Sequence, residues 1–249
     1  MPSSVYSSPK QLSLIKKILT GYIRLPFSDS IVPGAIMEGV LARVRGGQVL
    51  KTYDFIDVVK SEDRIGWQIK STKEDTPVTW KRAKIPNKQK LIAESQRNAV
   101  GREKLGSTII NLCNQHIQKS IKTYNLDQIG YCRLIIHDGG KVTYFERLLC
   151  TRAKPQVFDP NDFIWEWSEP KDAKEKEQLP AFHGTNRETG KKWWAWHGLS
   201  ENQLHFSGEE NWWPKKNKLH ALAFRFPTTE EKLSLEDFLS LLKKFDGDS

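Results

Sequence analysis

The sequence predicts a mixed α/β protein in which a β-sheet is flanked by helices and a smaller β-rich lobe follows toward the C-terminus. Stretches with helical apolar spacing alternate with runs of β-branched and aromatic residues, a pattern typical of a sheet covered by helices. With 249 residues, of which 38% are hydrophobic, the chain is long enough to bury a substantial core.

Two helices are predicted before the first strands. Pro9 to Ile23 carries leucine and isoleucine at helical spacing, with Lys16 and Lys17 off the apolar stripe. Gly34 to Val44 has a second apolar face, and Glu38 lies at the border of that face. Glu38 is therefore either an ordinary surface glutamate or a side chain that leans toward the segment that follows.

A β-hairpin is predicted next. Lys51 to Val59 and Ile65 to Thr72 are rich in strand-forming residues, and the charged run between them supplies the turn. Because side chains alternate along a strand, Gln68 and Lys70 share one face. Asp54 on the neighbouring strand is expected to meet them, which places a carboxylate, an amide and an ammonium at one point.

Such a group of side chains suits hydrolysis of a phosphodiester. A carboxylate can hold Mg²⁺, which keeps several waters and binds through one or two acids plus phosphate oxygens. The bound metal lowers the pKa of a water and neutralises charge that develops on the phosphate. A lysine beside it can stabilise that charge, or deprotonate the attacking water if its own pKa is depressed.

At these residues the chain resembles the PD-(D/E)XK nuclease superfamily, and more closely its type II restriction endonucleases. The family pattern is a Pro-Asp that opens a strand, followed across a hairpin by an acid, any residue and a lysine. Tyr53 stands at the proline, and Asp54 matches the aspartate. Gln68 stands at the second acid and Lys70 matches the lysine. Family members often add a glutamate on the preceding helix, and Glu38 is well placed for that role.

The resemblance implies a restriction-endonuclease-like core that cleaves double-stranded DNA with Mg²⁺ as cofactor. Its catalytic residues would be Asp54, Gln68, Lys70 and Glu38, and its metal ligands Asp54, Glu38 and Gln68. A homodimer is also implied, because cutting both strands of a palindrome needs two sites related by a twofold axis. Asp57 is the other candidate acid, but three positions along a strand would place it opposite Asp54. The alternative is an ordinary hairpin with solvated charges.

The charge of the chain favours a polyanionic partner. The formal net charge is +9 and the sequence pI is about 9.3, so phosphate contacts would release counterions. Lys81, Arg82 and Lys84 directly follow the predicted hairpin and are candidate contacts to the phosphates beside the scissile one. A solvated basic face is the alternative for these residues.

The remaining core elements are a long helix and three strands. Ser107 is expected to cap a helix that runs to about Tyr124, and His116 on it is interpreted as structural rather than as a ligand. Strands are predicted over 129–136 and 142–149, joined by the turn at Asp138, with a further short strand over 163–167. Residues 1–170 would thus form the nuclease core.

Beyond the core, a charged linker over 171–180 is predicted to lead into a Trp- and Lys-rich lobe over 181–227, followed by a C-terminal helix over 228–249. That helix is expected to pack on the core or on a dimer partner. The candidate DNA-binding residues of the lobe are Arg187, Lys191, Lys192, Trp193, Lys215 and Lys216, since lysines bind phosphates and tryptophans stack on bases. The alternative is that alternating tryptophans such as Trp194 and Trp196 build the core of a small sheet.

Other classes of function receive less support from the sequence. Three cysteines in 249 residues with wide spacing disfavour a disulfide scaffold and a structural zinc site. No apolar run reaches the length of a membrane span, and no signal peptide is expected, so we expect a cytoplasmic protein. Two rival functions remain: a structure- or modification-directed nuclease on the same core, and a non-catalytic protein that binds single-stranded nucleic acid.

Overall fold

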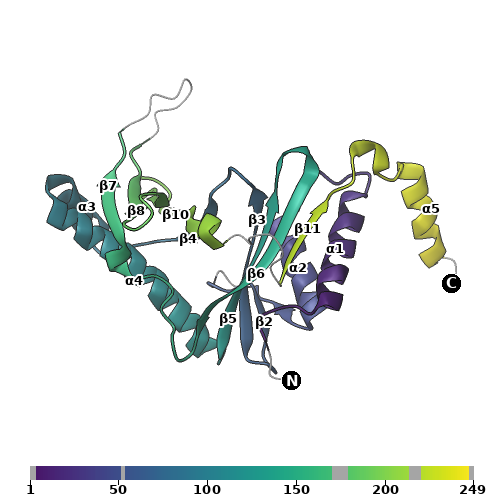
Figure 1. Cartoon of the computed structure of the whole chain (residues 1–249), viewed down its shortest axis with the longest axis horizontal. Coiled ribbons are helices and arrows are strands. Elements are labelled where there is room, and N and C mark those ends of the chain that lie inside the picture. The colour runs from purple at the N-terminus through teal and green to yellow at the C-terminus, as the bar shows by residue number, and fades with distance from the viewer. Residues whose placement is uncertain (1–3, 52–53, 170–178, 213–219, 247–249) are drawn as a thin grey trace.

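The protein has three layers, in which one sheet lies between two sets of covering elements (Figure 1). A computed structural model describes residues 4–51, 54–169, 179–212 and 220–246. Helices α1 (Pro9–Ile23) and α2 (Gly34–Arg45) cover one face of a six-stranded mixed sheet. The long helix α4 (Ala99–Thr123) and a separate five-stranded antiparallel sheet lie on its other face. The predicted mixed α/β class is confirmed at this level.

The six-stranded sheet has the order β1-β2-β3-β5-β6-β11. Its strands are β1 (Gln48–Val49), β2 (Val58–Lys60), β3 (Ile65–Lys73), β5 (Gln128–Ile136), β6 (Lys141–Thr151) and β11 (Ala221–Arg225). The pair β3–β5 is parallel, while the other neighbouring pairs are antiparallel. β3 and β5 are therefore the central strands, which need cover on both faces.

The five-stranded sheet has the order β4-β10-β9-β8-β7. Its strands are β4 (Val78–Arg82), β10 (Gln203–Phe206), β9 (Lys192–Trp196), β8 (Phe182–Asn186) and β7 (Phe163–Trp167). β4 and β7 come from the expected core over 1–170, whereas β11 of the expected lobe over 181–227 joins the six-stranded sheet. The division between the sheets thus differs from the expected sequence boundaries, because strand partners are chosen by tertiary contact. Most of the expected linker, residues 171–178, lies outside the described residues.

The helices follow the predicted apolar stripes, with differences in their bounds and one additional helix. α1 has the predicted bounds, and α2 extends to Arg45. α4 begins well before Ser107, because Asn98 caps it by accepting a hydrogen bond from the Gly101 N–H at 2.8 Å. Helix α3 (Lys88–Arg97) was not expected. The C-terminal helix α5 (Leu235–Asp246) begins later than the expected position 228, because Thr229–Glu231 forms a separate 3-10 turn. No helix within the described ranges is long and apolar enough to cross a membrane.

Each face of the six-stranded sheet has its own apolar core. Between the sheet and α1 and α2, Trp67 and Met37 are fully buried, and the Trp67 indole N–H donates to the Val5 carbonyl at 2.9 Å. On the other face, Trp80 packs with Trp194. Aromatic rings dominate this second core, which joins the two sheets into one body.

A buried ion pair also links the two sheets. Arg133 on β5 is fully buried, and its Nε lies 2.8 Å from Oε1 of Glu209, which belongs to the 3-10 helix Gly208–Trp212 that follows β10. The Tyr131 hydroxyl donates to the same carboxylate at 2.6 Å. Arg133 also donates to the Thr72 hydroxyl at 2.8 Å. The charges of this pair are therefore compensated within the chain.

Candidate active site

The candidate site lies at the edge of β3 where its hairpin partner ends. β2 pairs with β3 only from Val58 to Lys60, while β3 continues to Lys73. Just before β2, the Asp57 N–H donates to the Trp67 carbonyl at 2.8 Å. The Ile69 N–H in turn donates to Asp57 Oδ2 at 2.7 Å. The β3 backbone thus fixes the Asp57 carboxylate at the end of the hairpin ladder.

Helix α2 brings a second carboxylate, Glu38, to this edge. The Ser71 hydroxyl on β3 donates to the Val32 carbonyl at 2.7 Å, which ties the start of α2 to the strand. Met37 is buried in the same core as Ile69, so the neighbouring Glu38 lies at the border of the packed face. Glu38 Oε1 lies 3.7 Å from the position that a Cβ on Gly34 would take, an ordinary van der Waals distance. The carboxylate therefore lies beside the first turn of α2.

The Lys70 ammonium interacts electrostatically with both carboxylates of the site. Burial raises the pKa of Asp57, while the Lys70 ammonium and the Ile69 N–H oppose the rise. Burial also raises the pKa of Glu38, the Asp57 carboxylate adds to the rise, and Lys70 opposes it. Two acids thus share one lysine, and an added divalent cation would favour the ionised form of both.

Gln68 lies on the same face of β3 as Lys70 and is almost fully buried. Its Nε2 donates to the Trp80 carbonyl at 3.4 Å. Its Oε1 is buried with no hydrogen-bond partner among the described residues. A buried carbonyl oxygen without a partner is costly, and a cation or a water bound to it would remove that cost. Two carboxylates and this amide oxygen are hard oxygen ligands of the kind that Mg²⁺ prefers.

The described part of the chain contains no cluster of three or more His, Cys, Asp or Glu side chains placed to hold a metal. Glu38 and Asp57 provide two acids, and Mg²⁺ typically takes only one or two from the protein, with the rest from water and phosphate. The residues present therefore fit a magnesium ion that the substrate helps to bind, rather than a closed structural metal site.

The structure places Asp54 beside the end of α4. Its carboxylate accepts a hydrogen bond from the Tyr124 hydroxyl there, and its charge opposes the lowering of the Lys81 pKa by burial. Asp57 was expected to lie opposite Asp54, and the two acids do have different partners, but the reason given for this does not hold. It assumed a strand from Lys51 to Val59, whereas β2 begins at Val58, so strand alternation does not apply to residues 54–57. Tyr53 lies outside the described residues.

A basic group adjoins the site on the α4 side. Burial lowers the pKa of Lys81, Asp54 opposes the effect, and the charges of Lys119 and Lys70 add to it. Burial, with Lys81 and Lys119, also lowers the pKa of His116 to about 4, so this histidine is neutral at physiological pH. Burial and mutual repulsion disfavour the protonated forms of these basic side chains in the folded chain. A nearby anion such as a phosphate would favour the protonated forms. Sequence reasoning missed Lys119, because the helical stripe marks only apolar positions.

The other candidate DNA contacts do not form one group. Arg82 and Lys84 are exposed at one end of the five-stranded sheet, since Arg82 pairs with Gln203 at the start of β10. Lys191 and Lys192 are exposed at the opposite end, at the turn between β8 and β9. The expected basic residues are therefore spread along the sheet.

Three further candidates have other surroundings. Arg187 lies 3.0 Å from Glu103 on α4 and also donates to the Asn161 carbonyl at 2.9 Å, so its guanidinium is engaged within the chain. Trp193 is half-buried and its ring packs against Phe163, with ring centroids 5.6 Å apart. Lys215 and Lys216 lie outside the described residues.

The alternating tryptophans of β9 build the core of the small sheet. Trp194 and Trp196 are fully buried, and the Trp196 indole donates to the Ala83 carbonyl at 3.3 Å. Their rings are therefore closed to a nucleic-acid base, which confirms the alternative interpretation for these two residues.

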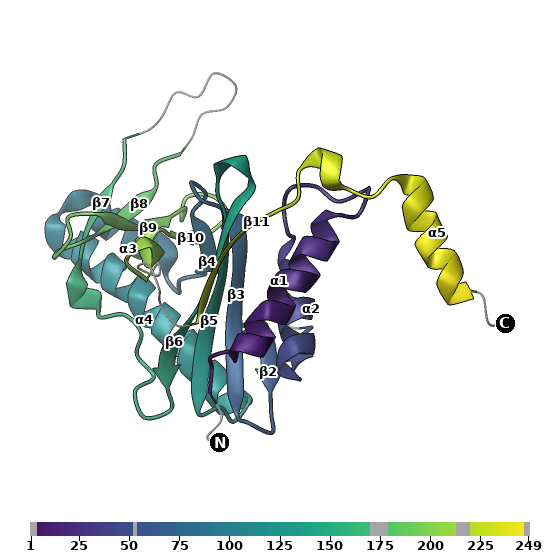
Figure 2. The same ribbon diagram turned by 45° about the vertical axis from the view of Figure 1, so that its right-hand side comes forward.

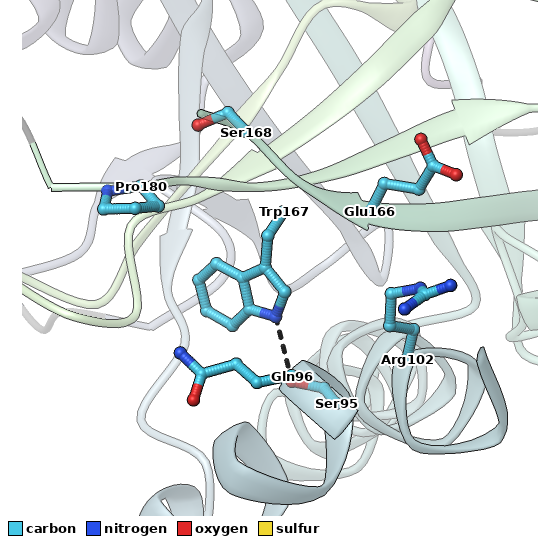
Figure 3. Close-up of a pocket in the computed structure, with 7 residues that line it drawn as sticks. All are labelled: Ser95, Gln96, Arg102, Glu166, Trp167, Ser168 and Pro180. Carbon is cyan, nitrogen blue, oxygen red and sulfur yellow. Dashed lines mark hydrogen bonds between the residues drawn. The ribbon is translucent and has the colours of Figure 1, made fainter. Parts of the chain in front are cut away.

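A separate concavity lies between α3, α4 and β7, away from the carboxylates (Figure 3). Its volume is about 400 Å³. Trp167 reaches into it and donates through its indole N–H to the Ser95 hydroxyl at 3.0 Å, while Arg102 and Glu166 lie at its side. The pocket combines one acid, one cation and one indole, and it shares no residue with the site at β3.

Comparison with family models, with characterised proteins and with solved structures finds no match for this chain. The site geometry and the sequence pattern therefore carry the functional argument.

Proposed function

We propose that the chain is a Mg²⁺-dependent endonuclease that hydrolyses phosphodiester bonds in double-stranded DNA, in the manner of the type II restriction enzymes its motif resembles. The observation that carries the proposal is the convergence of Glu38, Asp57 and Lys70 at the edge of β3 where β2 ends. In this form of the motif, Ile56-Asp57 takes the place first given to Tyr53-Asp54, and Gln68 with Lys70 keeps its place.

The proposed roles follow from the chemistry of each side chain. Glu38 and Asp57 would hold Mg²⁺, with the Gln68 Oε1 as a neutral third ligand. When bound, the ion supplies a water of lowered pKa and neutralises charge on the phosphate. The Lys70 ammonium donates to a phosphate oxygen and stabilises the negative charge that develops there. The Ile69 N–H keeps the Asp57 carboxylate oriented throughout.

The basic group beside the site supports a polyanionic substrate. Lys81 and Lys119 adjoin Asp54 on the α4 side, and Lys70 lies near enough to Lys81 to affect its pKa. These ammonium groups would bind the phosphates that flank the scissile one, which positions the backbone without reading sequence. The net charge of +9 adds long-range attraction to DNA.

The rival hypothesis, a non-catalytic protein that stacks single-stranded bases on tryptophan, receives less support. Trp194 and Trp196 are fully buried, and stacking needs an exposed aromatic face. A structure- or modification-directed nuclease would use the same site and differs only in the DNA that it cuts.

The test is cleavage of a set of plasmids and phage DNAs of varied sequence and methylation, with Mg²⁺ and with EDTA. Discrete fragments are expected with Mg²⁺ alone. Asp57→Asn and Lys70→Ala should each lower the cleavage rate by roughly 10²-fold or more, the scale of losing one electrostatic group at a reacting phosphate. Glu62→Gln, at an exposed position in the hairpin turn, is the matched control and should cut at the wild-type rate.

Asp54→Asn distinguishes the two candidate acids. We expect it to retain most of the cleavage activity, because the Asp54 carboxylate accepts a hydrogen bond from the Tyr124 hydroxyl at the end of α4. Equal loss in Asp54→Asn and Asp57→Asn would contradict the assignment of Asp57. Intact DNA under every condition would exclude the proposed function itself.

A further inference from the structure

Helix α5 stands apart from the rest of the molecule. In both views it projects beyond α1, away from the two sheets (Figures 1 and 2). Within the described residues, its contacts with α1 and the following loop lie at its start: the Leu233 N–H donates to the Arg24 carbonyl at 2.8 Å, and the Phe238 ring meets Phe27 edge-on with centroids 5.3 Å apart. Ser234 caps the helix by accepting from the Asp237 N–H at 3.0 Å. The start of α5 is therefore attached to the rest of the molecule, while one surface of the helix is left uncovered.

That surface is an apolar stripe. Leu235, Leu239 and Leu242 are 60%, 47% and 40% exposed. At about 100° per residue, these three leucines fall within a narrow sector of the helix, and Phe238 borders it on one side. Leucines at this spacing normally face a packing partner, and large exposed apolar surface on a helix marks an interaction site.

The charges beside the stripe indicate which partner fits. Glu236 and Lys243 lie on the same flank of the stripe, about two helical turns apart. In an antiparallel helix pair the same flank of each helix faces the other, so Glu236 would face the partner's Lys243, and the twofold axis would repeat the contact. In a parallel pair, the flank that carries Glu236 and Lys243 would instead face the apolar flank of the partner helix, on the side of Phe238. Antiparallel packing also aligns the helix dipoles favourably.

We propose that the stripe of α5 packs antiparallel against the same stripe on a second copy of this chain, about a twofold axis. The partner is specified by self-complementarity, since one helix carries both the apolar seam and both halves of the charge pair. None of these residues belongs to the candidate active site, so the pairing of α5 does not depend on the proposed nuclease function.

The first test is the mass in solution, measured by light scattering or sedimentation over a range of concentrations without DNA or divalent cations. Wild type should approach twice the chain mass of 28.7 kDa as concentration rises. Leu239→Glu should weaken the association at least tenfold. Leu14→Glu is the matched control, because Leu14 is a similarly exposed leucine (44%) on α1. A monomeric wild type, or a dimer that Leu239→Glu leaves intact, would overturn the proposal.

The second test addresses orientation by charge reversal. Glu236→Lys and Lys243→Glu should each weaken the dimer several-fold, and more at low salt than at high salt. The double variant Glu236→Lys/Lys243→Glu should recover the wild-type affinity, because each reversed residue again meets its opposite on the partner. Failure of the double variant to recover would rule out the antiparallel register. These measurements use no cleavage assay, so their failure would leave the nuclease proposal unaffected.

Discussion

Two groups of charged side chains lie on the adjacent strands β3 and β5, and they are balanced in different ways. Arg133 pairs with Lys70 in the β3–β5 register. The Arg133 guanidinium donates to the Glu209 carboxylate and the Thr72 hydroxyl, and the Tyr131 hydroxyl donates to the same carboxylate. Around Lys70, in contrast, two acids share one ammonium and both have raised pKa values. The first group is complete within the chain and is structural, whereas the second gains from an added cation.

The largest effect on the free energy of unfolding is expected when the buried pair Arg133–Glu209 is broken. Glu209→Ala leaves Arg133 buried without a counter-charge, so the free energy of unfolding should fall by roughly 3–5 kcal/mol. Urea unfolding followed by tryptophan fluorescence measures the loss. Glu188→Ala, at an exposed position, should change stability by less than about 0.5 kcal/mol. Equal effects from the two variants would mean that the Arg133 pair is not what links the sheets.

The unbalanced group should respond instead to divalent cations. Ca²⁺, a non-productive substitute for Mg²⁺, should raise the unfolding free energy of the wild type, by about 2.7 kcal/mol at a hundredfold excess over Kd. Asp57→Asn and Glu38→Gln should lose most of this gain, while Glu62→Gln should keep it. The gain should shrink at acidic pH, because protons compete for carboxyls whose pKa values are raised. Thermal melts with and without Ca²⁺ from pH 5 to 8 measure both effects.

Without a cation, the two acids should cost the folded state stability near neutral pH. A carboxyl whose pKa is raised by folding binds its proton more tightly in the folded chain. Its favourable contribution is therefore complete below the unfolded pKa and is lost as pH rises through the folded value. Asp57→Asn should then stabilise the metal-free protein at pH 7, because the substitution removes a carboxylate that folding disfavours at that pH. The difference should vanish near the ordinary pKa of 3.8, and a destabilised variant at pH 7 would contradict the assignment.

The smallest expected effect is on the salt dependence of DNA binding, which should show which basic residues contact the DNA. Lys81→Ala, beside the unbalanced group, should reduce the slope of log K against log salt for DNA binding by about one. Lys192→Ala, at the far end of the small sheet, should change this slope less. Fluorescence anisotropy with a DNA duplex, Ca²⁺ and stepped salt measures both variants. A larger effect at Lys192 would place the DNA over the turn between β8 and β9.

Much of the architecture follows from local sequence patterns. The apolar spacing of Pro9–Ile23 predicts α1 with its observed bounds, and the strands at 129–136 and 142–149 appear as β5 and β6 with small extensions. The pattern fails at α4, whose start is decided by the Asn98 cap rather than by its stripe. It also fails for the division into sheets, since β11 pairs with β6 far away in the chain.

The residues of the candidate site also differ in how far local sequence predicts them. Lys70 and Gln68 were identified from the motif, and Glu38 from its border position on a helix, because these properties are local. The choice between Asp54 and Asp57 cannot be made from local sequence. It depends on where β2 begins, and Val58 and Val59 are the residues of that segment that pair with β3. Ile69 then offers its N–H to the acid just before them.

The sequence by itself determined the mixed α/β class, the basic charge and the residue types that resemble a nuclease motif, because composition, periodicity and short spacing are properties of the chain. Only the tertiary structure decided which acid stands beside Lys70, that Trp194 and Trp196 are core, and that α5 is uncovered. Each of these depends on contacts between distant segments, whose geometry is set by the packing of the whole molecule.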